Sequence, residues 1–443
     1  MAYPDLSSKS AALYQRAQKV LPDGNSRTTI AIKPYPIYID YASGAEVTDV
    51  DNNRYIDFNN NYTSLIHGHA FKPVQEAVQS QMRKGTACSF TTEPEIELAE
   101  LLCDRVDSFE QIRFCNSGSE AVMNMLKAAR AFTGKPKVAK IEGLYHGSYD
   151  FAEVSLKNRP KDRNGSVPIS TAYSFGTPNS VLDEVITLPF NEIEATEALI
   201  NKHADNLACI MIDLMPQTMG MVSPSSEYLQ ALVKLTKMHK ILLAFDEVIS
   251  FRLGYSGGQG MFGIKPDITS LGKIIGGGFP VGAVAGRKDV MSVFEPQGNQ
   301  AARLPHGGTF NGNPVTMVAG KVAMNEMTEV RFEQLNKAAC SLRDRVSKIF
   351  SELNIHGQVT GNGSLFALRF HKRPTQHFAD LVSTDEEILF MDRFRKYLIS
   401  HGIWMGSGMT GCLSTATTAA HIDEFTRVLE SGVKEFKKDL PNQ

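Results

Sequence analysis

Short apolar runs alternate with longer segments of helical periodicity from about Val74 onward. The apolar runs have the length of buried strands, and the gaps between them can hold helices. This alternation predicts an α/β fold in which helices cover a mostly parallel central sheet. Ligand chemistry in such sheets gathers at the carboxyl ends of the strands. Strands are expected at residues 111–115, 137–141, 208–213 and 242–246, and helices at residues 120–132 and 226–239.

The two ends of the chain have a different pattern. Residues 8–20 have the periodicity of an amphipathic helix, and a long helical stretch at residues 313–353 leads into a C-terminal α/β unit. Between turn residues, the strand-like runs 37–41, 46–50 and 54–58 predict a small antiparallel meander. We therefore expect the N-terminal segment and the C-terminal unit to form one smaller domain beside a large one. The expected parts are residues 1–70, 71–330 and 331–443.

Composition narrows the class of protein. The 443 residues carry a formal net charge of -2 without a basic stripe, so nucleic acid is not an expected partner. The chain has no apolar run long enough to span a bilayer, and residues 1–20 lack the apolar core of a signal peptide, so we expect a cytoplasmic protein without membrane contact. The six cysteines form no CxxC pair, and His67 and His69 have no cluster of carboxylates at ligand spacing. Neither disulfides nor a metal site is therefore predicted.

The segment Asn116-Ser117-Gly118-Ser119-Glu120 follows an expected strand and opens an expected helix. Its small residues let backbone N–H groups approach an anion closely, and the start of a helix favours a phosphate. A Gly-Ser turn in this place is also a common helix cap. The segment therefore fits either a phosphate site or a simple cap.

Three further residues lie where a parallel sheet would carry chemistry. Asp246 ends an apolar strand, and a buried carboxylate there needs a cationic partner such as a protonated pyridine nitrogen, unless it only caps a helix. Lys273 lies between an apolar strand and a triple glycine. A desolvated lysine has a lowered pKa and can form a Schiff base, whereas a surface lysine is the plainer alternative. Tyr145 also follows a strand and fits either stacking on a cofactor ring or a place in the core.

These features follow one another in a specific order: the phosphate segment, the aromatic residue, Asp246-Glu247-Val248, Gly272-Lys273, and HGGTFNGNP at residues 306–314. In this order they resemble the class III aminotransferases, over about residues 11–435. The resemblance is closest to the branch that holds glutamate-1-semialdehyde aminomutase and the β-amino-acid (β-phenylalanine-type) aminotransferases. It implies a fold-type I, aspartate-aminotransferase-like homodimer that uses pyridoxal 5′-phosphate.

The resemblance also implies roles for single residues around the cofactor ring. Lys273 would bind the cofactor as a Schiff base and move a proton during the reaction. Asp246 would pair with the pyridinium nitrogen and keep the ring an electron sink. Tyr145 would stack on one ring face, and Val248 would pack against the other.

The phosphate of the cofactor would have ligands from two subunits, by the same resemblance. Ser117, Gly118 and Ser119 would hold it within one chain. Thr309 would reach the phosphate bound by the neighbouring subunit, so that a complete site would need the homodimer.

The chain departs from the family pattern after the fourth expected strand, where residues 213–218 read DLMPQT in place of the usual Glu-Pro. In one register Asp213 matches the glutamate, and Thr218 neighbours the phenolic oxygen of the ring. In the other register Gln217 is the partner of that oxygen. We favour Gln217 because an amide can donate to a phenolate oxygen.

Substrate choice depends on arginines. Arg27 matches the position at which the β-amino-acid enzymes bind the substrate carboxylate, and a planar guanidinium suits that group. The aminomutases place their arginine two residues later, where this chain has Thr29. A solvated surface arginine is the alternative for Arg27. Arg252 is a second candidate that fits a structural role equally well, Tyr62 fits the pocket or the core, and residues 406–411 contain no arginine.

The sequence therefore predicts a transaminase that moves an amino group by a ping-pong scheme from an amino acid to a 2-keto acid. The position of Arg27 favours a β-amino acid such as β-phenylalanine as the donor. The alternative is an aminomutase of the glutamate-1-semialdehyde type, or a racemase, on the same scaffold. A catalytically silent binding protein is disfavoured because both Lys273 and Asp246 are present.

Overall fold

The structure, a computed structural model, describes residues 3–159 and 161–441. Within these residues the central sheet has the strand order β4-β12-β11-β10-β9-β5-β8. All neighbouring pairs are parallel except those of β12, which runs antiparallel to both of its neighbours. The predicted mostly parallel sheet is thus confirmed. The strands are β4 Gln111–Cys115, β5 Lys137–Ile141, β8 Val185–Leu188, β9 Leu207–Asp213, β10 Leu242–Asp246, β11 Ile268–Gly272 and β12 Gly282–Gly286.

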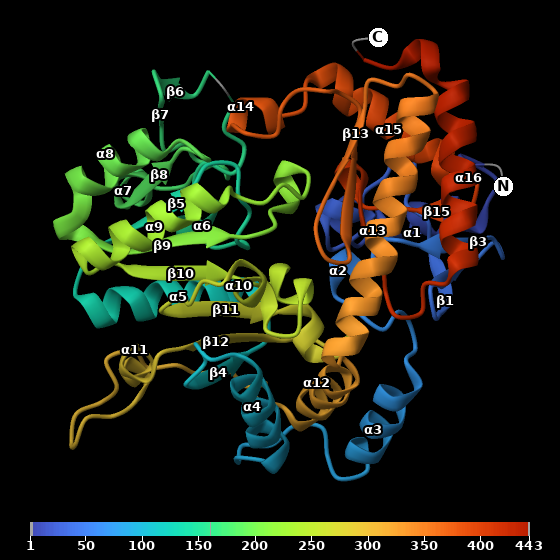
Figure 1. Ribbon diagram of the computed structural model, residues 1–443. Coiled ribbons are helices and arrows are strands. Elements are labelled where there is room, and N and C mark those ends of the chain that lie inside the picture. The colour runs from blue at the N-terminus through green and yellow to red at the C-terminus, as the bar shows by residue number, and fades with distance from the viewer. Residues whose placement is uncertain (1–2, 160, 442–443) are drawn as a thin grey trace.

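Helices cover both faces of this sheet (Figure 1). In β9, Cys209 and Met211 pack into the cluster of helix α5 (Gly118–Thr133), whereas Ile210 and Ile212 pack into that of α9 (Ser226–His239). Successive side chains of a strand point to opposite faces, so a strand covered on both sides must be apolar throughout. This double burial explains the continuous apolar runs in the sequence.

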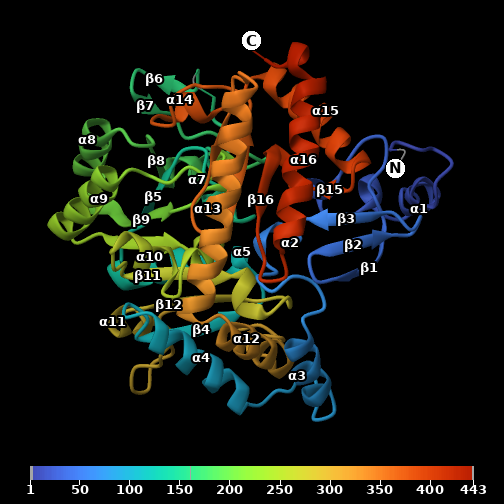
Figure 2. The same cartoon turned by 45° about the vertical axis from the view of Figure 1, so that its right-hand side comes forward.

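The long helical stretch expected at residues 313–353 is two helices, so that prediction is wrong in detail. Helix α12 (Pro314–Glu326) ends before Thr328, and α13 (Glu329–Glu352) begins after it. The Thr328 hydroxyl accepts a hydrogen bond from the backbone N–H of Arg331 at 3.3 Å and caps the second helix. The orange α13 runs beside the red C-terminal helix α16 (Ala419–Glu435) in both views (Figures 1 and 2).

The N- and C-terminal segments lie together on one side of the molecule (Figure 2). The expected meander is present as the antiparallel strands β1 (Ile39–Ser43), β2 (Glu46–Asp49) and β3 (Arg54–Asp57), and the C-terminal β15 (Ile403–Trp404) extends it in parallel beside β3. A smaller domain made from both ends of the chain is therefore observed. Its other elements are α1 Lys9–Ala17, β13 Gln358–Thr360, β14 Leu365–Arg369, α15 Asp385–Ser400, β16 Thr410–Cys412 and α16 Ala419–Glu435.

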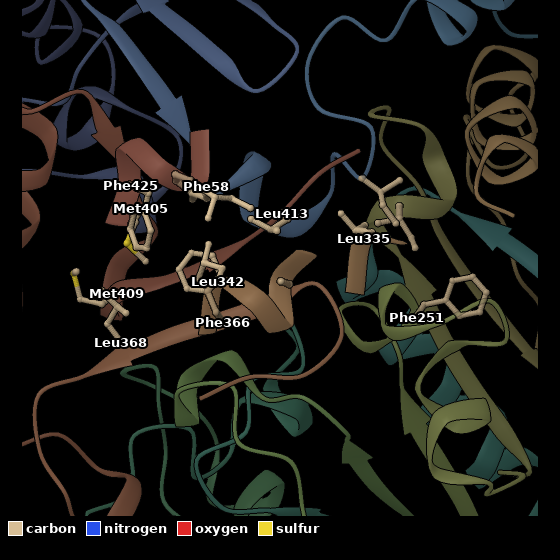
Figure 3. Packing of buried hydrophobic residues seen from close by; sticks show 14 of the residues in the cluster. Phe58, Phe251, Leu335, Leu342, Phe366, Leu368, Met405, Met409, Leu413 and Phe425 are labelled. Carbon is tan, nitrogen blue, oxygen red and sulfur yellow. The ribbon is translucent and has the colours of Figure 1, made fainter. Parts of the chain in front are cut away.

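Aromatic packing joins the two ends of the chain in one core. The rings of Phe58 and Phe425 lie 4.9 Å apart, and that of Phe366 lies 5.9 Å from Phe58 and 5.6 Å from Phe425. Figure 3 shows these three side chains converging from the N-terminal segment, β14 and α16. Such pairs are stabilising beyond their buried area, by about 0.5–1.5 kcal/mol each. Phe58 therefore fixes the chain just before residues 60–64, and two of these residues line the cavity described below.

The remaining elements connect these parts. In the described part of the chain, no helix is long and apolar enough to cross a lipid bilayer. The connecting elements are α2 Asn60–Thr63, α3 Lys72–Met82, α4 Glu93–Arg105, α6 Asp150–Glu153, β6 Arg163–Asn164, β7 Val167–Pro168, α7 Asn179–Glu184, α8 Ile193–His203, α10 Gly257–Phe262, α11 Lys288–Met291 and α14 Phe378–Leu381.

Candidate active site

A cavity of about 380 Å³ opens at the carboxyl ends of the central strands. Asp213 ends β9, Asp246 ends β10 and Lys273 follows β11, and all three line the cavity. Ser117, the N-cap of α5, borders the same space. Cavities of this size accommodate small-molecule ligands. The structure thus brings together the strand-end carboxylate, the lysine and the phosphate segment that the sequence predicts to be functional.

Three donors hold the buried Asp246 carboxylate. Its Oδ1 accepts hydrogen bonds from the Val248 N–H at 3.1 Å and from the Ser270 hydroxyl at 3.0 Å. Its Oδ2 accepts a hydrogen bond from His146 Nδ1 at 2.8 Å. A carboxylate fixed from both oxygens has little freedom to turn. It therefore faces the cavity in one fixed orientation.

His146 is a candidate functional residue that the sequence reasoning did not single out. The side chain is buried and lines the cavity, and its Nε2 has no hydrogen-bond partner among the described residues. Burial lowers the pKa of the imidazole, and the neighbouring Asp246 only partly opposes this effect. A neutral imidazole with its proton on Nδ1 fits both observations. The available signal was its place beside Tyr145, but its partner lies a hundred residues away in the chain.

Lys273 has the electrostatic environment of a reactive amine. Burial lowers its pKa to about 8, although the carboxylates of Asp246 and Asp213 act in the opposite direction. About a tenth of the amine is therefore unprotonated at pH 7, far more than for an ordinary lysine, and only this form acts as a nucleophile or a base. The backbone of Lys273 has φ +51°, which is uncommon for a residue other than glycine. Strained backbone of this kind concentrates at active sites.

The start of α5 forms the other wall of the cavity. Helix α5 begins at Gly118, so the first N–H groups of the helix have no carbonyl partner within it. The Ser119 hydroxyl accepts from the Ser148 N–H at 3.0 Å. A Cβ on residue 118 would lie 2.9 Å from Val248 Cγ1, so only glycine fits without a shift of Val248. Such a helix start suits a phosphate group.

The residues present fit the cofactor that the resemblance implies. The cavity combines a helix start for a phosphate, the Asp246 carboxylate for a ring cation and the Lys273 amine for a covalent bond. Tyr145 borders the cavity with 46% of its surface exposed, so its ring is free to pack against a ligand. Val248 lies on the cavity wall as well.

The structure brings Asp213 rather than Gln217 to the cavity. Asp213 is the parallel neighbour of Asp246, and burial, followed by the charge of Asp246, raises its pKa well above the usual value. The Gln217 side chain donates to Thr410 Oγ1 at 3.0 Å and is not part of the lining. The Thr218 hydroxyl donates to the Gly143 carbonyl at 2.6 Å. The predicted contact of Gln217 with the cofactor stays a prediction.

The candidates for substrate binding differ in position. Arg27 is exposed, and its Nη1 donates to Asn61 Oδ1 at 3.0 Å, and Asn61 lines the cavity. Tyr62 is half-buried, lies outside the lining and donates its hydroxyl to the Thr29 carbonyl. Arg252 is fully buried and donates to two backbone carbonyls, which fits its structural alternative.

Thr309 is exposed and does not line the cavity of its own chain. Its predicted contact across a dimer stays a prediction.

Three comparisons relate the chain to known proteins. The family model for class III aminotransferases matches residues 30–431. The chain is 37% identical to the glutamate-1-semialdehyde 2,1-aminomutase of Methanothermobacter thermautotrophicus, over 97% of this chain and 100% of that protein. Among solved structures, an omega-transaminase from Sphaerobacter thermophilus is 47% identical with a TM-score of 0.96, and covers 98% of this chain and 99% of its own. A β-phenylalanine aminotransferase from Variovorax paradoxus is 30% identical with a TM-score of 0.88, over 98% and 95% of the two chains.

Proposed function

The chain belongs to the class III aminotransferases, a pyridoxal-phosphate-dependent family, and from this premise we propose that it transfers the amino group of a β-amino acid to a 2-keto acid. The observation that carries the choice of substrate is the position of Arg27. Its guanidinium donates a hydrogen bond to Asn61, and Asn61 borders the cavity that Lys273 also lines.

The residues of the cavity have separate tasks in this reaction. Bound pyridoxal phosphate supplies an electron sink for negative charge that develops on the substrate. The Lys273 amine takes a proton from the substrate carbon and returns it, which its pKa of about 8 allows near neutral pH. Asp246, which His146 holds in place, keeps a negative charge next to the ring nitrogen.

The binding residues complete the assignment of the cavity. Ser117, Gly118 and Ser119, which line the cavity at the start of α5, would hold the phosphate, and Tyr145 and Val248 of the same lining would pack against the ring. We include in the proposal a homodimer in which Thr309 contacts the neighbouring subunit's phosphate. Sedimentation of the holoenzyme at the mass of one chain would contradict this dimer.

The place of Arg27 favours a carboxylate that is distant from the reacting amine. Arg27 and Asn61 are both exposed, so their hydrogen bond lies where the cavity meets solvent. A β-amino acid carries its carboxylate one carbon further from the amine-bearing carbon than an α-amino acid does. A guanidinium at the mouth suits that geometry, and its planar fork suits a carboxylate. The similarity to a β-phenylalanine aminotransferase supports the same choice.

The test is an absorbance measurement on the purified holoenzyme. Addition of β-phenylalanine without a keto acid should bleach the yellow absorbance of the bound cofactor, and pyruvate or 2-oxoglutarate should restore it. α-Phenylalanine, which has the same ring, is the matched control and should bleach the absorbance far more slowly. A yellow enzyme that no β-amino acid bleaches would contradict the proposed substrate class.

A glutamate-1-semialdehyde-type aminomutase is the second candidate. The observation in its favour is the 37% identity, over its full length, to a curated protein of that name. An aminomutase would rearrange glutamate-1-semialdehyde in the absence of any keto acid. Product formation under these conditions, together with a failure to bleach with β-amino acids, would favour this candidate over the aminotransferase.

A further inference from the structure

Residues Asn60–Thr63, labelled α2, form a left-handed turn at the edge of the cavity. Their φ angles are +48°, +48°, +55° and +71°, and none of the four is glycine. Residues with a Cβ visit this conformation as single residues, because the left-handed helix brings Cβ too close to the next carbonyl oxygen. A run of four persists only where the surroundings fix it.

Hydrogen bonds from outside the turn fix its beginning. Asp57 Oδ1 accepts from the N–H groups of Asn59 at 2.7 Å and Asn60 at 3.0 Å. The Asn60 side chain donates to the Cys412 carbonyl at 3.0 Å. Strand β3 and strand β16, which lie far apart in the sequence, therefore both determine the conformation of the turn.

Arg252 fixes the end of the turn. Its Nη1 donates to the Thr63 carbonyl at 3.0 Å, and its Nη2 donates to the Leu413 carbonyl at 2.7 Å. The side chain is completely buried and forms no salt bridge among the described residues. Both Nη groups of this buried guanidinium donate to backbone carbonyls, whereas its Nε has no partner among the described residues, and the two bonds assign the side chain the task of holding the turn.

The turn presents its side chains to the cavity and to the N-terminal segment. Asn61 and Ser64 line the cavity, and the Asn61 amide donates to the Ser64 hydroxyl at 3.2 Å. Asn61 Oδ1 accepts from Arg27 Nη1 at 3.0 Å. The hydroxyl of Tyr62 donates to the Thr29 carbonyl. Two successive residues of the turn therefore hold the segment that carries Arg27.

We propose that Asn61, presented by this left-handed turn, is a specificity-determining residue that orients the Arg27 guanidinium for the substrate carboxylate. This inference rests on the proposed function, because it takes Arg27 as the carboxylate ligand. A free arginine side chain loses much rotamer entropy when it binds a ligand, and a hydrogen bond made beforehand reduces that loss.

The chemistry of the acceptor supports this role. The Asn61 amide oxygen is neutral and engages one of the five N–H donors of the guanidinium, so the others are left for a ligand. Arg27 forms no salt bridge within residues 3–159 and 161–441, so its charge is not neutralised in advance. A carboxylate in place of the amide would compete with the substrate for that charge.

Equilibrium binding of 3-phenylpropanoate to the holoenzyme tests the proposal. This compound has the ring and carboxylate of β-phenylalanine but no amine, so it binds without reacting. Its neutral amide, 3-phenylpropanamide, is the matched ligand without charge. The Asn61→Gly variant lacks the amide but tolerates the left-handed backbone. We expect it to bind 3-phenylpropanoate about tenfold more weakly than the wild type does, with little change in its affinity for the neutral ligand. Asn61→Asp should lower the affinity for 3-phenylpropanoate further, because the new charge pairs with Arg27.

A double-variant cycle separates orientation of Arg27 from a general structural effect. In the Arg27→Ala background, Asn61→Gly should cause no further loss of 3-phenylpropanoate binding. If Arg27→Ala lowers the affinity for 3-phenylpropanoate but the Asn61 variants do not, this inference is wrong and the proposed function stands. If Arg27→Ala itself leaves carboxylate binding unchanged, the carboxylate role of Arg27 fails, and both proposals fall. Near-ultraviolet circular dichroism confirms that each variant is folded.

Discussion

The two ends of the cavity are built in different ways. At the cofactor end, Asp246 ends strand β10, Lys273 immediately follows strand β11 and Ser117 caps helix α5, so each group is attached to a regular element. At the mouth, Arg27 and Asn61 are exposed and belong to irregular segments, one of which has left-handed backbone. Groups on rigid elements are positioned more precisely than groups on loops, whereas loops tolerate variation. We infer that the cofactor end provides the chemistry and the mouth selects the substrate.

The two ends of the cavity also differ in electrostatics, because the ionisable groups are buried at the cofactor end and exposed at the mouth. At the cofactor end burial lowers the pKa of Lys273 to about 8 and raises that of Asp213. At the mouth, Arg27 carries a charge that is exposed to solvent. Changes at the cofactor end should therefore affect all substrates by the same factor, and changes at the mouth should alter the preference among them.

Lys273→Ala should have the largest effect. We expect kcat to fall by about 10³-fold or more for every donor, because the variant lacks both the nucleophile and the proton carrier. Borohydride reduction followed by mass spectrometry should attach the cofactor to the wild-type protein but not to the variant. Lys265→Ala is the control, because Lys265 is exposed and pairs with Asp107 on the surface. Turnover close to that of the wild type in Lys273→Ala would refute the assignment.

Asp246→Asn should have the next largest effect, a loss of about 10²–10³-fold in kcat. A neutral amide keeps the shape of the side chain but cannot hold a ring nitrogen protonated. If the cofactor end provides the chemistry and the mouth selects the substrate, kcat should fall by the same factor for β-phenylalanine and for an amine without a carboxylate. A loss confined to one of these donors would place Asp246 in substrate selection and would break the distinction between the two ends.

The two ends also differ in how far the sequence predicts them. Asp246 and Lys273 could be found because each lies at the end of an apolar strand, and the carboxyl ends of parallel strands meet at one edge. The contact between His146 and Asp246 could not be found, because it joins residues a hundred positions apart. Asn61 was missed for a similar reason, since its left-handed conformation depends on contacts made by Asp57, Cys412 and Arg252.

The fold shows the same limit. Alternating apolar runs predicted the central sheet and its helices, because local periodicity reflects burial on both faces. The antiparallel β12, which reads Gly-Ala-Val-Ala-Gly, has no such distinct signal and was not predicted. The end of α12 before Thr328 was missed because periodicity continues across it, and only the cap formed by the Thr328 side chain marks the break. Thus, local patterns indicate elements, whereas directions and boundaries depend on contacts.

The rate of cofactor incorporation should depend on pH through Lys273. The lowered pKa of about 8 means that the amine is mostly protonated, and therefore not nucleophilic, below that pH. Incorporation into the apoenzyme should accelerate about tenfold from pH 6 to 7 and about fivefold from pH 7 to 8, and level off toward pH 9. Stopped-flow absorbance over pH 6 to 9.5 measures this rate. A rate that still rises about tenfold between pH 8.5 and 9.5 would show that burial does not lower the pKa of Lys273.

Gly118→Ala should have the smallest effect, a loss of about five- to tenfold in affinity for pyridoxal phosphate. The added Cβ would lie 2.9 Å from Val248 Cγ1, so Val248 would have to move on the cavity wall.

Gly134→Ala is the matched control at the other end of α5. Gly134 has φ +70° with open space around it, so alanine there should lower the free energy of unfolding by about 1 kcal/mol and leave cofactor affinity unchanged. Equilibrium dialysis measures the affinity of both variants. Equal losses of affinity in both would mean that stability of the helix, and not the close approach at its start, controls the binding of the phosphate. A loss in Gly118→Ala alone, the same for every donor, would place the start of α5 with the cofactor end and leave substrate selection to the mouth.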